Sequence, residues 1–299
     1  MDRRRGTRYN VNALILCGLV FFVIVATIFC MVANGREAAR EEQRIAAEQQ
    51  AEAEKAAAEK KAQEEAEAAL EARKKSDSVQ PGVPVGTTEA PEGEKVVYLT
   101  FDDGPSKNTQ RVLDILAEYD AKATFFITGQ QPEYFSMIKT AYDAGHTIGL
   151  HSYIHEYDQV YASVDAYFKD LEKIGELAKE QIGFVPCYIR FPGGASNTVS
   201  RKYTEGIMTE LTEKVLEKGY QYYDWNISSG DGSKATKEEI IKQSETDEYD
   251  HVMILFHDAA TKDTTVEALP DILKYYQDKG YEFRGIDRES LIFHHQTNN

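Results

Sequence analysis

Two adjacent carboxylates follow an apolar run of the chain. Residues 96–99 are Val-Val-Tyr-Leu, and Asp102 and Asp103 come soon after, in the segment TFDDGP. His151 and His155 lie further along, four residues apart. Aspartate and histidine together can hold a divalent transition metal, and a second carboxylate beside the metal can deprotonate a bound water. These residues therefore predict a metal-dependent hydrolase.

From about Lys95 onward, short apolar runs alternate with amphipathic stretches, which favours an α/β fold with its site at the C-terminal ends of the strands. The run 123–128 is continuously apolar, as expected where a parallel strand is buried on both faces. Because polar residues follow several of these runs, we expect one shared active site. The expected strands are 96–101, 123–128, 146–150, 187–190, 220–226, 252–256 and 281–285.

Two other expected strands end in residues that could take part in catalysis. Arg190 precedes Pro192 and Gly193 in RFPGG; an arginine there can clamp a carboxylate, and a Gly-rich turn can aim a backbone N–H at an oxyanion. His257, in LFHD, follows the strand 252–256, a position suited to a general acid. The histidines without such a setting are expected to be structural or exposed: His146, His251, His294 and His295.

Composition limits the remaining choices. The formal net charge is -16, which argues against nucleic acid as a partner, because phosphate binding needs a basic face. Of the three cysteines, Cys187 is alone in the globular part, so neither an intradomain disulfide nor a Cys-based zinc site is expected. Cys187 precedes an apolar run, and we interpret it as a packed side chain rather than a nucleophile.

Residues 13–33 carry no charge and are long enough to cross roughly 30 Å of hydrocarbon as a helix. The basic tail 1–12 precedes them, which predicts a cytoplasmic N-terminus. A cleaved signal peptide is the alternative, but the apolar segment exceeds the usual ~7–15 residues and Met31-Val32-Ala33 lacks a small residue at the −3 position of a cleavage site. We expect a single-pass signal anchor in the cell membrane, with the catalytic domain outside.

The next segment, 34–75, consists almost wholly of good helix formers. It lacks a regular apolar seam, so a solvated helical stalk is expected, with weak self-association through alanines as the alternative. Residues 76–94 are rich in Pro and Gly and are expected to form a flexible linker. Residues 95–299 then form one catalytic domain.

Taken together, the series TFDDGP, HSYIH, RFPGG, a Trp/Asp segment and LFHD resembles the polysaccharide deacetylases of the NodB-homology type, carbohydrate esterase family 4. The resemblance covers about residues 95–290. It implies a distorted (β/α) barrel that removes N-acetyl groups from N-acetylglucosamine residues of a polysaccharide. It also implies a metal, expected to be Zn²⁺, with another divalent cation such as Co²⁺ as the alternative.

The resemblance implies a role for each matching residue. Asp102 would be the general base, and the metal ligands would be Asp103, His151 and His155. On the substrate side, Arg190 would orient Asp102 and His257 would be the general acid. The substrate and oxyanion contacts would come from Pro192, Gly193 and Leu255, the last lining the acetyl pocket.

The Trp/Asp segment departs from the family pattern. The family often has Asp followed directly by Trp, whereas Asp231 is followed by Gly232 and the only tryptophan is Trp225. We assign Asp231 as the partner that tunes His257. Trp225 is either the aromatic wall of the acetyl pocket or a core residue, the commoner fate of a strand tryptophan. Gly193 stands where many relatives carry a bulky residue.

A domain outside the membrane suits a wall polymer, so peptidoglycan is the preferred substrate; chitin-type oligomers, secreted poly-GlcNAc and acetyl-xylan remain open. One rival class is a non-haem iron oxygenase, which also uses two histidines and a carboxylate, although the strand–helix alternation speaks against it. Another is a non-catalytic, membrane-tethered wall-binding protein. Acetate release would separate these classes.

Overall fold

The computed structural model describes residues 11–299, with side chains from residue 15 onward. The expected cytoplasmic tail, 1–12, therefore lies almost entirely outside the described residues. The chain divides into two compact units, Met1–Leu70 and Glu71–Asn299, which are described separately.

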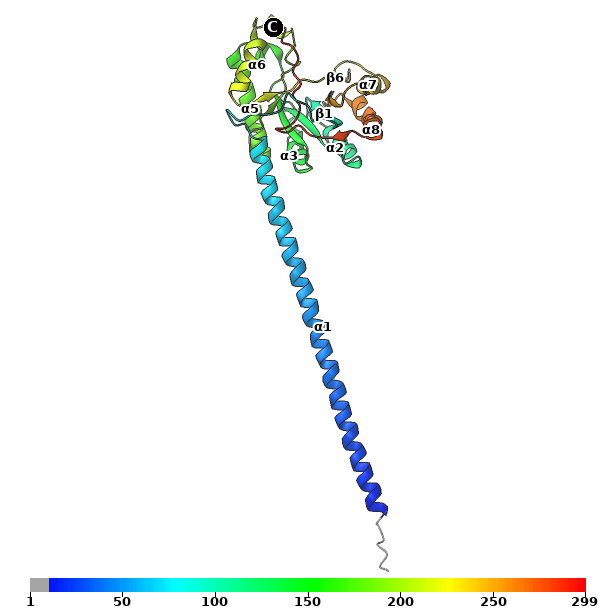
Figure 1. Ribbon diagram of the computed structural model, residues 1–299. Coiled ribbons are helices and arrows are strands. Elements are labelled where there is room, and N and C mark those ends of the chain that lie inside the picture. The colour runs from blue at the N-terminus through cyan, green and yellow to red at the C-terminus, as the bar shows by residue number, and fades with distance from the viewer. Residues whose placement is uncertain (1–10) are drawn as a thin grey trace, which may run out of the picture. The chain divides into compact units, whose positions relative to one another are not determined.

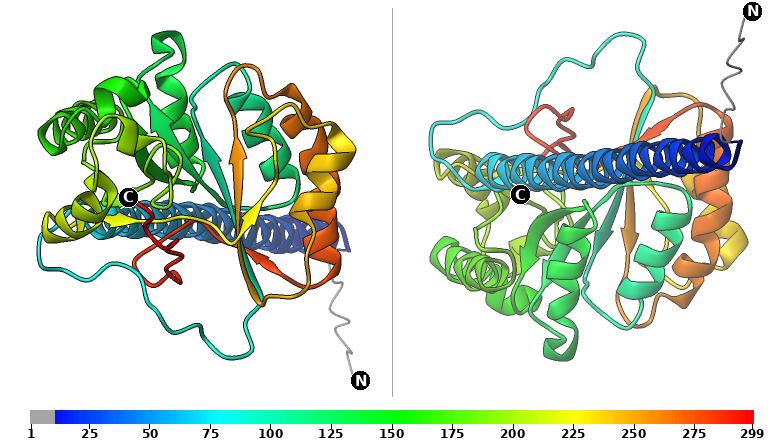
Figure 2. Two further views of the ribbon diagram at one scale, coloured as in Figure 1. Left: turned by 90° about the horizontal axis from the view of Figure 1, so that it is seen from above. Right: turned by 90° about the horizontal axis from the view of Figure 1, so that it is seen from below.

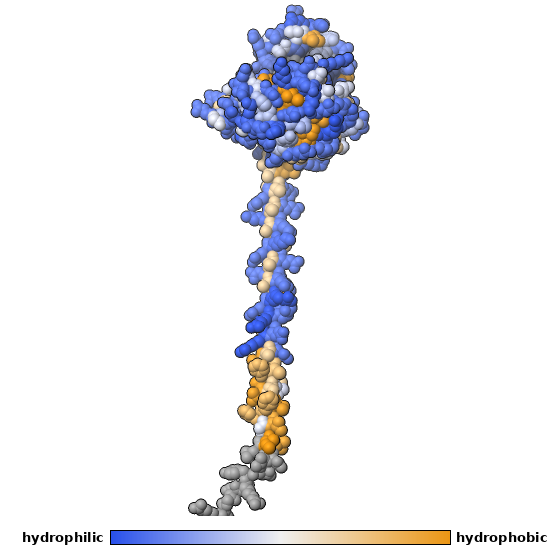
Figure 3. Space-filling model, turned by 90° about the vertical axis from the view of Figure 1, so that its right-hand side faces the viewer, coloured by the Kyte–Doolittle hydropathy of each residue, from blue (hydrophilic) through white to orange (hydrophobic). Residues whose placement is uncertain are grey.

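Helix α1, Val11–Asp77, begins in the first unit. Its apolar part is exposed along its length (Figure 3), and an 18-residue window in it has a mean hydropathy of 3.0. By length and composition this helix can cross a membrane, although an N-terminal signal sequence would pass the same test. Beyond it, the exposed stretch carries ion pairs at helical spacing, such as Lys60–Glu64 and Lys61–Glu65. The self-association expected of this stretch stays a prediction.

The second unit contains a parallel sheet in the order β5-β4-β3-β2-β1-β7-β6, with β8 pairing on β1. All of its strand pairs are parallel, which confirms the α/β expectation. The strands are β1 Val96–Asp102, β2 Ala123–Thr128, β3 Thr147–Ser152, β4 Tyr188–Ile189, β5 Gln221–Tyr222, β6 Ile227–Ser228, β7 His251–His257 and β8 Glu282–Phe283.

The two edge strands, β5 and β6, follow each other directly in the chain. Tyr222 and Ile227 are five residues apart, a separation that spans at most about 18 Å. The sheet therefore curls into a barrel that is open only across this short gap. The expected single strand 220–226 was wrong in this respect, because the chain leaves one edge of the sheet there and rejoins it at the other.

Helices pack around the outside of the curled sheet, each against the next (Figure 1, Figure 2). In the order of contact they are α7 Lys237–Ser244, α8 Asp263–Asp278, α2 Thr109–Glu118, α3 Ser136–Asp143, α5 Val164–Ile182 and α6 Ile207–Glu217. The one-turn helix α4 Tyr157–Val160 and the 3₁₀ turns η1 Pro132–Tyr134 and η2 Ser200–Lys202 complete the set.

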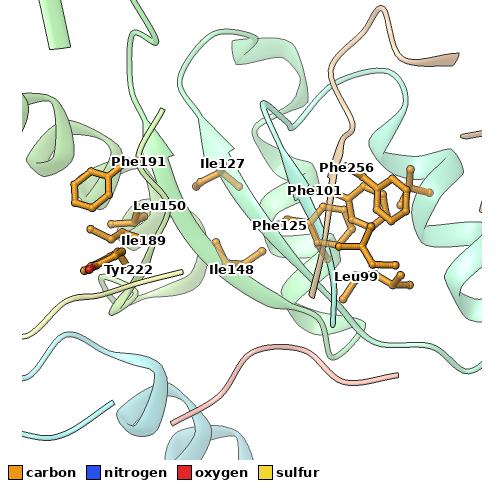
Figure 4. Packing of buried hydrophobic residues seen from close by; sticks show 14 of the residues in the cluster. Leu99, Phe101, Phe125, Ile127, Ile148, Leu150, Ile189, Phe191, Tyr222 and Phe256 are labelled. Atoms are coloured by element: carbon orange, nitrogen blue, oxygen red, sulfur yellow. The ribbon is translucent and has the colours of Figure 1, made fainter. Parts of the chain in front are cut away.

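Alternation along the strands divides the core into two layers, because successive side chains point to opposite faces. Phe101 stacks between Phe125 and Phe256, with ring centroids 5.2 and 5.5 Å away, in the layer under the helices (Figure 4). Tyr98 and Phe126 belong to the second cluster, which fills the barrel interior. Apolar packing on both faces explains why these runs are continuously apolar.

The segment 76–94, expected to be a linker, lies within the second unit and packs against the rest of it. Val79 N–H donates to Val185 O at 2.9 Å, and the side chain of Val85 is buried. The Arg288 guanidinium donates to Ser78 O at 2.8 Å and to Pro84 O at 2.9 Å. The proposed division of the chain at 76–94 stays a prediction, and these contacts attach the segment to the barrel surface.

Candidate metal centre and active site

The polar groups expected at one site do come from the same end of the barrel. Asp102 ends β1, His151 is near the end of β3, Arg190 follows β4, and His257 ends β7. Asp102, Arg190 and His257 each lie an even number of residues from an interior side chain of the same strand, Tyr98, Tyr188 and Met253 respectively, so they face inward. His151 lies an odd number of residues from Ile148 and Leu150, which belong to the layer under the helices, so it faces inward too. The parallel strands therefore bring residues from four parts of the sequence into one interior space.

Asp103, His151 and His155 form a cluster that could hold a metal ion, with their ligand atoms all within 4.8 Å of one another. Asp103 Oδ1 lies 3.3 Å from His155 Nε2 and 3.6 Å from His151 Nε2, and the two Nε2 atoms are 3.2 Å apart. Asp103 Oδ1 is buried and has no hydrogen-bond partner among the described residues. Three lone pairs thus converge, as a cation requires.

Backbone and hydrogen-bond constraints hold these ligands. Asp103 and His155 have φ angles of 70° and 56°, in the left-handed region, which Asp and His tolerate better than most residues. His151 Nδ1 lies 2.7 Å from the carbonyl oxygen of Arg190, so Nδ1 carries the proton and Nε2 is free to bind. Burial, then the neighbouring His155, lowers the pKa of His151 to about 3, which keeps this imidazole neutral.

The loop between the two histidines rests on Asp170, a residue of α5 that the sequence analysis missed. Its carboxylate accepts hydrogen bonds from Ser152 Oγ at 2.7 Å and from the backbone N–H groups of Tyr153 and Ile154, both at 2.9 Å. Ser152 Oγ in turn accepts from His155 N–H at 2.8 Å. The only signal in the sequence is an aspartate on the apolar face of an amphipathic helix.

Asp102 is not part of the metal cluster but pairs with Arg190, as expected. Arg190 Nη1 donates to Asp102 Oδ1 at 2.9 Å, and the arginine side chain is completely buried. Its other donors reach the carbonyl oxygens of Tyr223 and Asp224 and the hydroxyl of Thr100. Burial raises the pKa of Asp102, and Arg190 opposes this only in part. The carboxylate is therefore a stronger base than an ordinary aspartate.

His257 and Asp231 form a second pair, as expected. His257 Nδ1 lies 2.7 Å from Asp231 Oδ1, and Asp231 Oδ2 accepts from His257 N–H and Thr265 Oγ1, both at 2.8 Å. Burial alone would lower the pKa of His257, but the hydrogen bond and charge of Asp231, with the charges of Asp102 and Asp103, raise it to about 9. At neutral pH this imidazole carries a proton that it can give up.

The RFPGG loop lies beside the metal cluster. Gly193 and Gly194 have φ angles of 78° and 77°, which glycine adopts without strain. Pro192 O accepts a hydrogen bond from Tyr161 Oη at 2.8 Å, which anchors the loop. No partner for the Gly193 N–H is found among residues 11–299, so it is free to donate to a ligand.

Tyr157, at the start of α4, was also missed by the sequence analysis. A Cβ on Gly193 would overlap its hydroxyl oxygen. Burial, followed by the charges of Asp103 and Asp102, raises the pKa of Tyr157 to about 12. This hydroxyl therefore lies at the active site and keeps its proton. The sequence carries no motif that marks it.

The remaining expected substrate residues are Leu255 and Trp225. Leu255 is two residues before His257 on β7 and so faces the same interior space. Trp225 is half-buried, and its ring would contact a Cβ on Gly194 at 3.0 Å. A Cβ at position 232 would lie 3.4 Å from His257 Cε1. Because residue 232 is glycine, no side chain from this position contacts the imidazole.

Asp258, next to His257, is a third residue that the sequence analysis missed. It is completely buried, and its N–H donates to Asp102 O at 3.1 Å. Thr109 Oγ1 donates to its carboxylate at 2.5 Å, and Asn108 Nδ2 donates to the next carbonyl, Ala259 O, at 3.0 Å. Burial raises the pKa of Asp258 to about 7. These bonds tie the TFDDGP loop to the end of β7.

The fold and the site define a hydrolase with a candidate metal centre in a parallel (β/α) barrel. The family model for polysaccharide deacetylases matches residues 89–208. A peptidoglycan-N-acetylglucosamine deacetylase of Bacillus cereus is 34% identical over 206 residues, covering 66% of this chain and 71% of that protein. The chain belongs to the polysaccharide deacetylase family, carbohydrate esterase family 4.

Two further relatives support this membership. The crystal structure of the catalytic domain of a peptidoglycan N-acetylglucosamine deacetylase from Eubacterium rectale matches with a TM-score of 0.68 and 41% identity, over 71% of this chain and 98% of that domain. A peptidoglycan-N-acetylmuramic acid deacetylase of Bacillus subtilis is 31% identical, covering 65% of this chain and 71% of that protein. Because the relatives are named as deacetylases, the iron oxygenase and the non-catalytic protein are set aside.

Proposed function

We propose that this chain is a membrane-anchored, zinc-dependent deacetylase that removes N-acetyl groups from N-acetylglucosamine residues of peptidoglycan. The observation that carries the proposal is that the two adjacent aspartates, Asp102 and Asp103, have different surroundings. Asp103 joins two imidazoles in a candidate metal site, whereas Asp102 stays outside that cluster and is held by Arg190. A hydrolase that activates a metal-bound water needs a base that is not itself a metal ligand.

The donor set fits zinc. A zinc ion bound tetrahedrally at about 2.0–2.1 Å keeps its ligand atoms roughly 3.3 Å apart, and the three ligand separations here are 3.2, 3.3 and 3.6 Å. Asp103, His151 and His155 would hold the ion and leave a position open. Bound there, the cation would lower the pKa of a water and polarise the acetyl carbonyl. Another divalent cation such as Co²⁺ would use the same donors.

The protein groups around that position supply the proton transfers. Asp102, fixed by Arg190, accepts a proton from the attacking water, and its raised pKa suits this task. The Gly193 N–H donates to the carbonyl oxygen as negative charge develops there. His257, kept protonated by Asp231, gives its proton to the departing amine. Leu255 and Trp225 are proposed to line the pocket for the acetyl group.

Peptidoglycan is proposed as the substrate for two reasons. Relatives whose names include peptidoglycan deacetylation cover 66% and 71% of this chain, and the apolar part of α1 can anchor the chain in a membrane. We propose that residues 13–33 span the cell membrane, with the basic N-terminus in the cytoplasm and the catalytic unit outside. Protease added to intact cells should then degrade the catalytic unit, and its full protection would refute this topology.

The function is tested by acetate release. The full-length chain in detergent, loaded with Zn²⁺, is incubated separately with peptidoglycan, chitin oligomers, poly-GlcNAc and acetyl-xylan. We expect acetate from peptidoglycan, and the other arms define the range of substrates. Product analysis of the peptidoglycan shows whether N-acetylglucosamine or N-acetylmuramic acid lost its acetyl group. Release from acetyl-xylan alone, or from no polymer, would refute the proposal.

A further inference from the structure

Tyr157 places a hydroxyl where Gly193 leaves room for one. Gly193 has no side chain, and the space that its Cβ would occupy is taken by the Tyr157 hydroxyl oxygen. The two residues come from separate elements, since Tyr157 begins α4 and Gly193 belongs to the loop after β4. The phenol therefore lies against the main chain of the proposed oxyanion donor.

The ring of Tyr157 is held in this position by aromatic contacts. It lies edge-on to His155, with ring centroids 6.2 Å apart and an interplanar angle of 86°, and packs on Tyr161 at 5.5 Å. Tyr157 is half-buried. A group fixed by a metal-site histidine on one side and a buried tyrosine on the other is pre-organised, so its hydroxyl needs no rearrangement to meet a ligand.

The hydroxyls of the two tyrosines differ in what they bind. Tyr161 Oη donates to Pro192 O at 2.8 Å, so its hydrogen bond supports the loop. No hydrogen-bond partner for the Tyr157 hydroxyl is found within the part of the chain that the structure describes. The Gly193 N–H is likewise without a partner there. Two neighbouring donors thus remain available beside the metal cluster.

We propose that the Tyr157 hydroxyl is a second hydrogen-bond donor to the acetyl carbonyl oxygen, acting beside the Gly193 N–H as that oxygen becomes negatively charged. This inference rests on the proposed deacetylase function. The phenol donates a hydrogen bond and keeps its proton, so no proton transfer is added to those of Asp102 and His257. Tyr157 then contributes to stabilising the transition state rather than to binding the sugar chain.

The test is Tyr157→Phe in the full-length, Zn²⁺-loaded chain, which removes the hydroxyl and keeps the ring contacts. Loss of one oxyanion donor typically lowers kcat by about 10²-fold. We expect a fall of that order, with KM and the Zn²⁺ affinity measured by competition with a chelating dye both unchanged. Tyr203→Phe, at an exposed tyrosine next to η2, is the matched control and should behave as the unaltered chain.

Each other outcome overturns the inference. If the unaltered chain releases acetate and Tyr157→Phe does so at the same kcat, the hydroxyl only fills space, while the proposed function stands. A rise in KM alone shows uniform substrate binding rather than transition-state stabilisation. A parallel loss of Zn²⁺ affinity shows that Tyr157 acts through His155. If the unaltered chain releases no acetate from any substrate, the proposed function fails and this inference fails with it.

Discussion

The pair formed by Asp231 and His257 makes a quantitative prediction. Asp231→Asn keeps the shape of the side chain and leaves an oxygen that can still accept from His257 Nδ1–H, but it removes the negative charge. The hydrogen bond and charge of Asp231 are the main influences that raise the pKa of His257 to about 9 against its burial. Because that burial persists in the variant, the pKa of His257 should fall to about 6.5 or lower.

The consequence for activity follows from the fraction of His257 that is protonated. At about pH 7.5, a pKa of about 9 leaves about 97% of the imidazole protonated, whereas a pKa of about 6.5 leaves about 9%. The variant should therefore lose roughly tenfold in kcat at this pH if His257 is the acid. Moreover, kcat should decline with rising pH above about 9 in the unaltered chain and already above about 6.5 in the variant.

The same pair affects stability, with a definite sign. A histidine whose folded-state pKa is raised stabilises the fold below its unfolded pKa of about 6.5, and this contribution disappears as the pH rises through about 9. The difference corresponds to on the order of 3 kcal/mol of unfolding free energy. Asp231→Asn should abolish most of this pH dependence.

The assay is acetate release from peptidoglycan between about pH 5 and 10, with urea unfolding in the same buffers. Asp247→Asn is the matched control, because Asp247 is exposed and pairs with Lys279 on the surface. If kcat declines at the same alkaline pH in Asp231→Asn and in the unaltered chain, the assignment of His257 as the acid is refuted.

Three further predictions concern the metal and the core. His155→Ala should abolish both stoichiometric Zn²⁺ binding and acetate release; retention of full activity would contradict the ligand assignment. Asp170→Asn should weaken Zn²⁺ affinity about 10–100-fold, because that carboxylate holds the loop between the histidines. Asp165→Asn, in the first turn of the same helix, is its control, and equal dye-competition affinities in the two variants would contradict the role of Asp170. Phe101→Ala should lower the free energy of unfolding by about 3–5 kcal/mol in urea titrations, because the ring is stacked between two others in the core; a loss under about 1 kcal/mol would show that the site collapses around the cavity.

Much of the site was predictable because its ligands lie at the ends of strands. A continuously apolar run followed by a polar residue marks where a buried strand reaches the open end of a barrel. Asp102, His151 and His257 were found in this way, and strand alternation places all three in the barrel interior. The pairing of Arg190 with Asp102 and of Asp231 with His257 also agrees with the expectation.

The region after β5 shows where periodicity fails. Residues 220–226 were predicted as one strand, but only Gln221–Tyr222 and then Ile227–Ser228 pair with neighbours, at opposite edges of the sheet. Between them, Asp224 accepts hydrogen bonds from the N–H groups of Ala195 and His295. Partners that lie tens of residues away decide this turn, and no local pattern of apolar residues encodes them.

By itself, the sequence determined the family, the α/β fold and the candidate residues for metal binding and proton transfer, because these depend on residue type and on spacing within single segments. Only the tertiary structure decided which groups support them. Asp170, Tyr157 and Asp258 act on loops that other segments contribute. Hydrogen bonds and steric contacts of this kind depend on positions in space that folding creates, and their residues carry no periodic or motif signal along the chain.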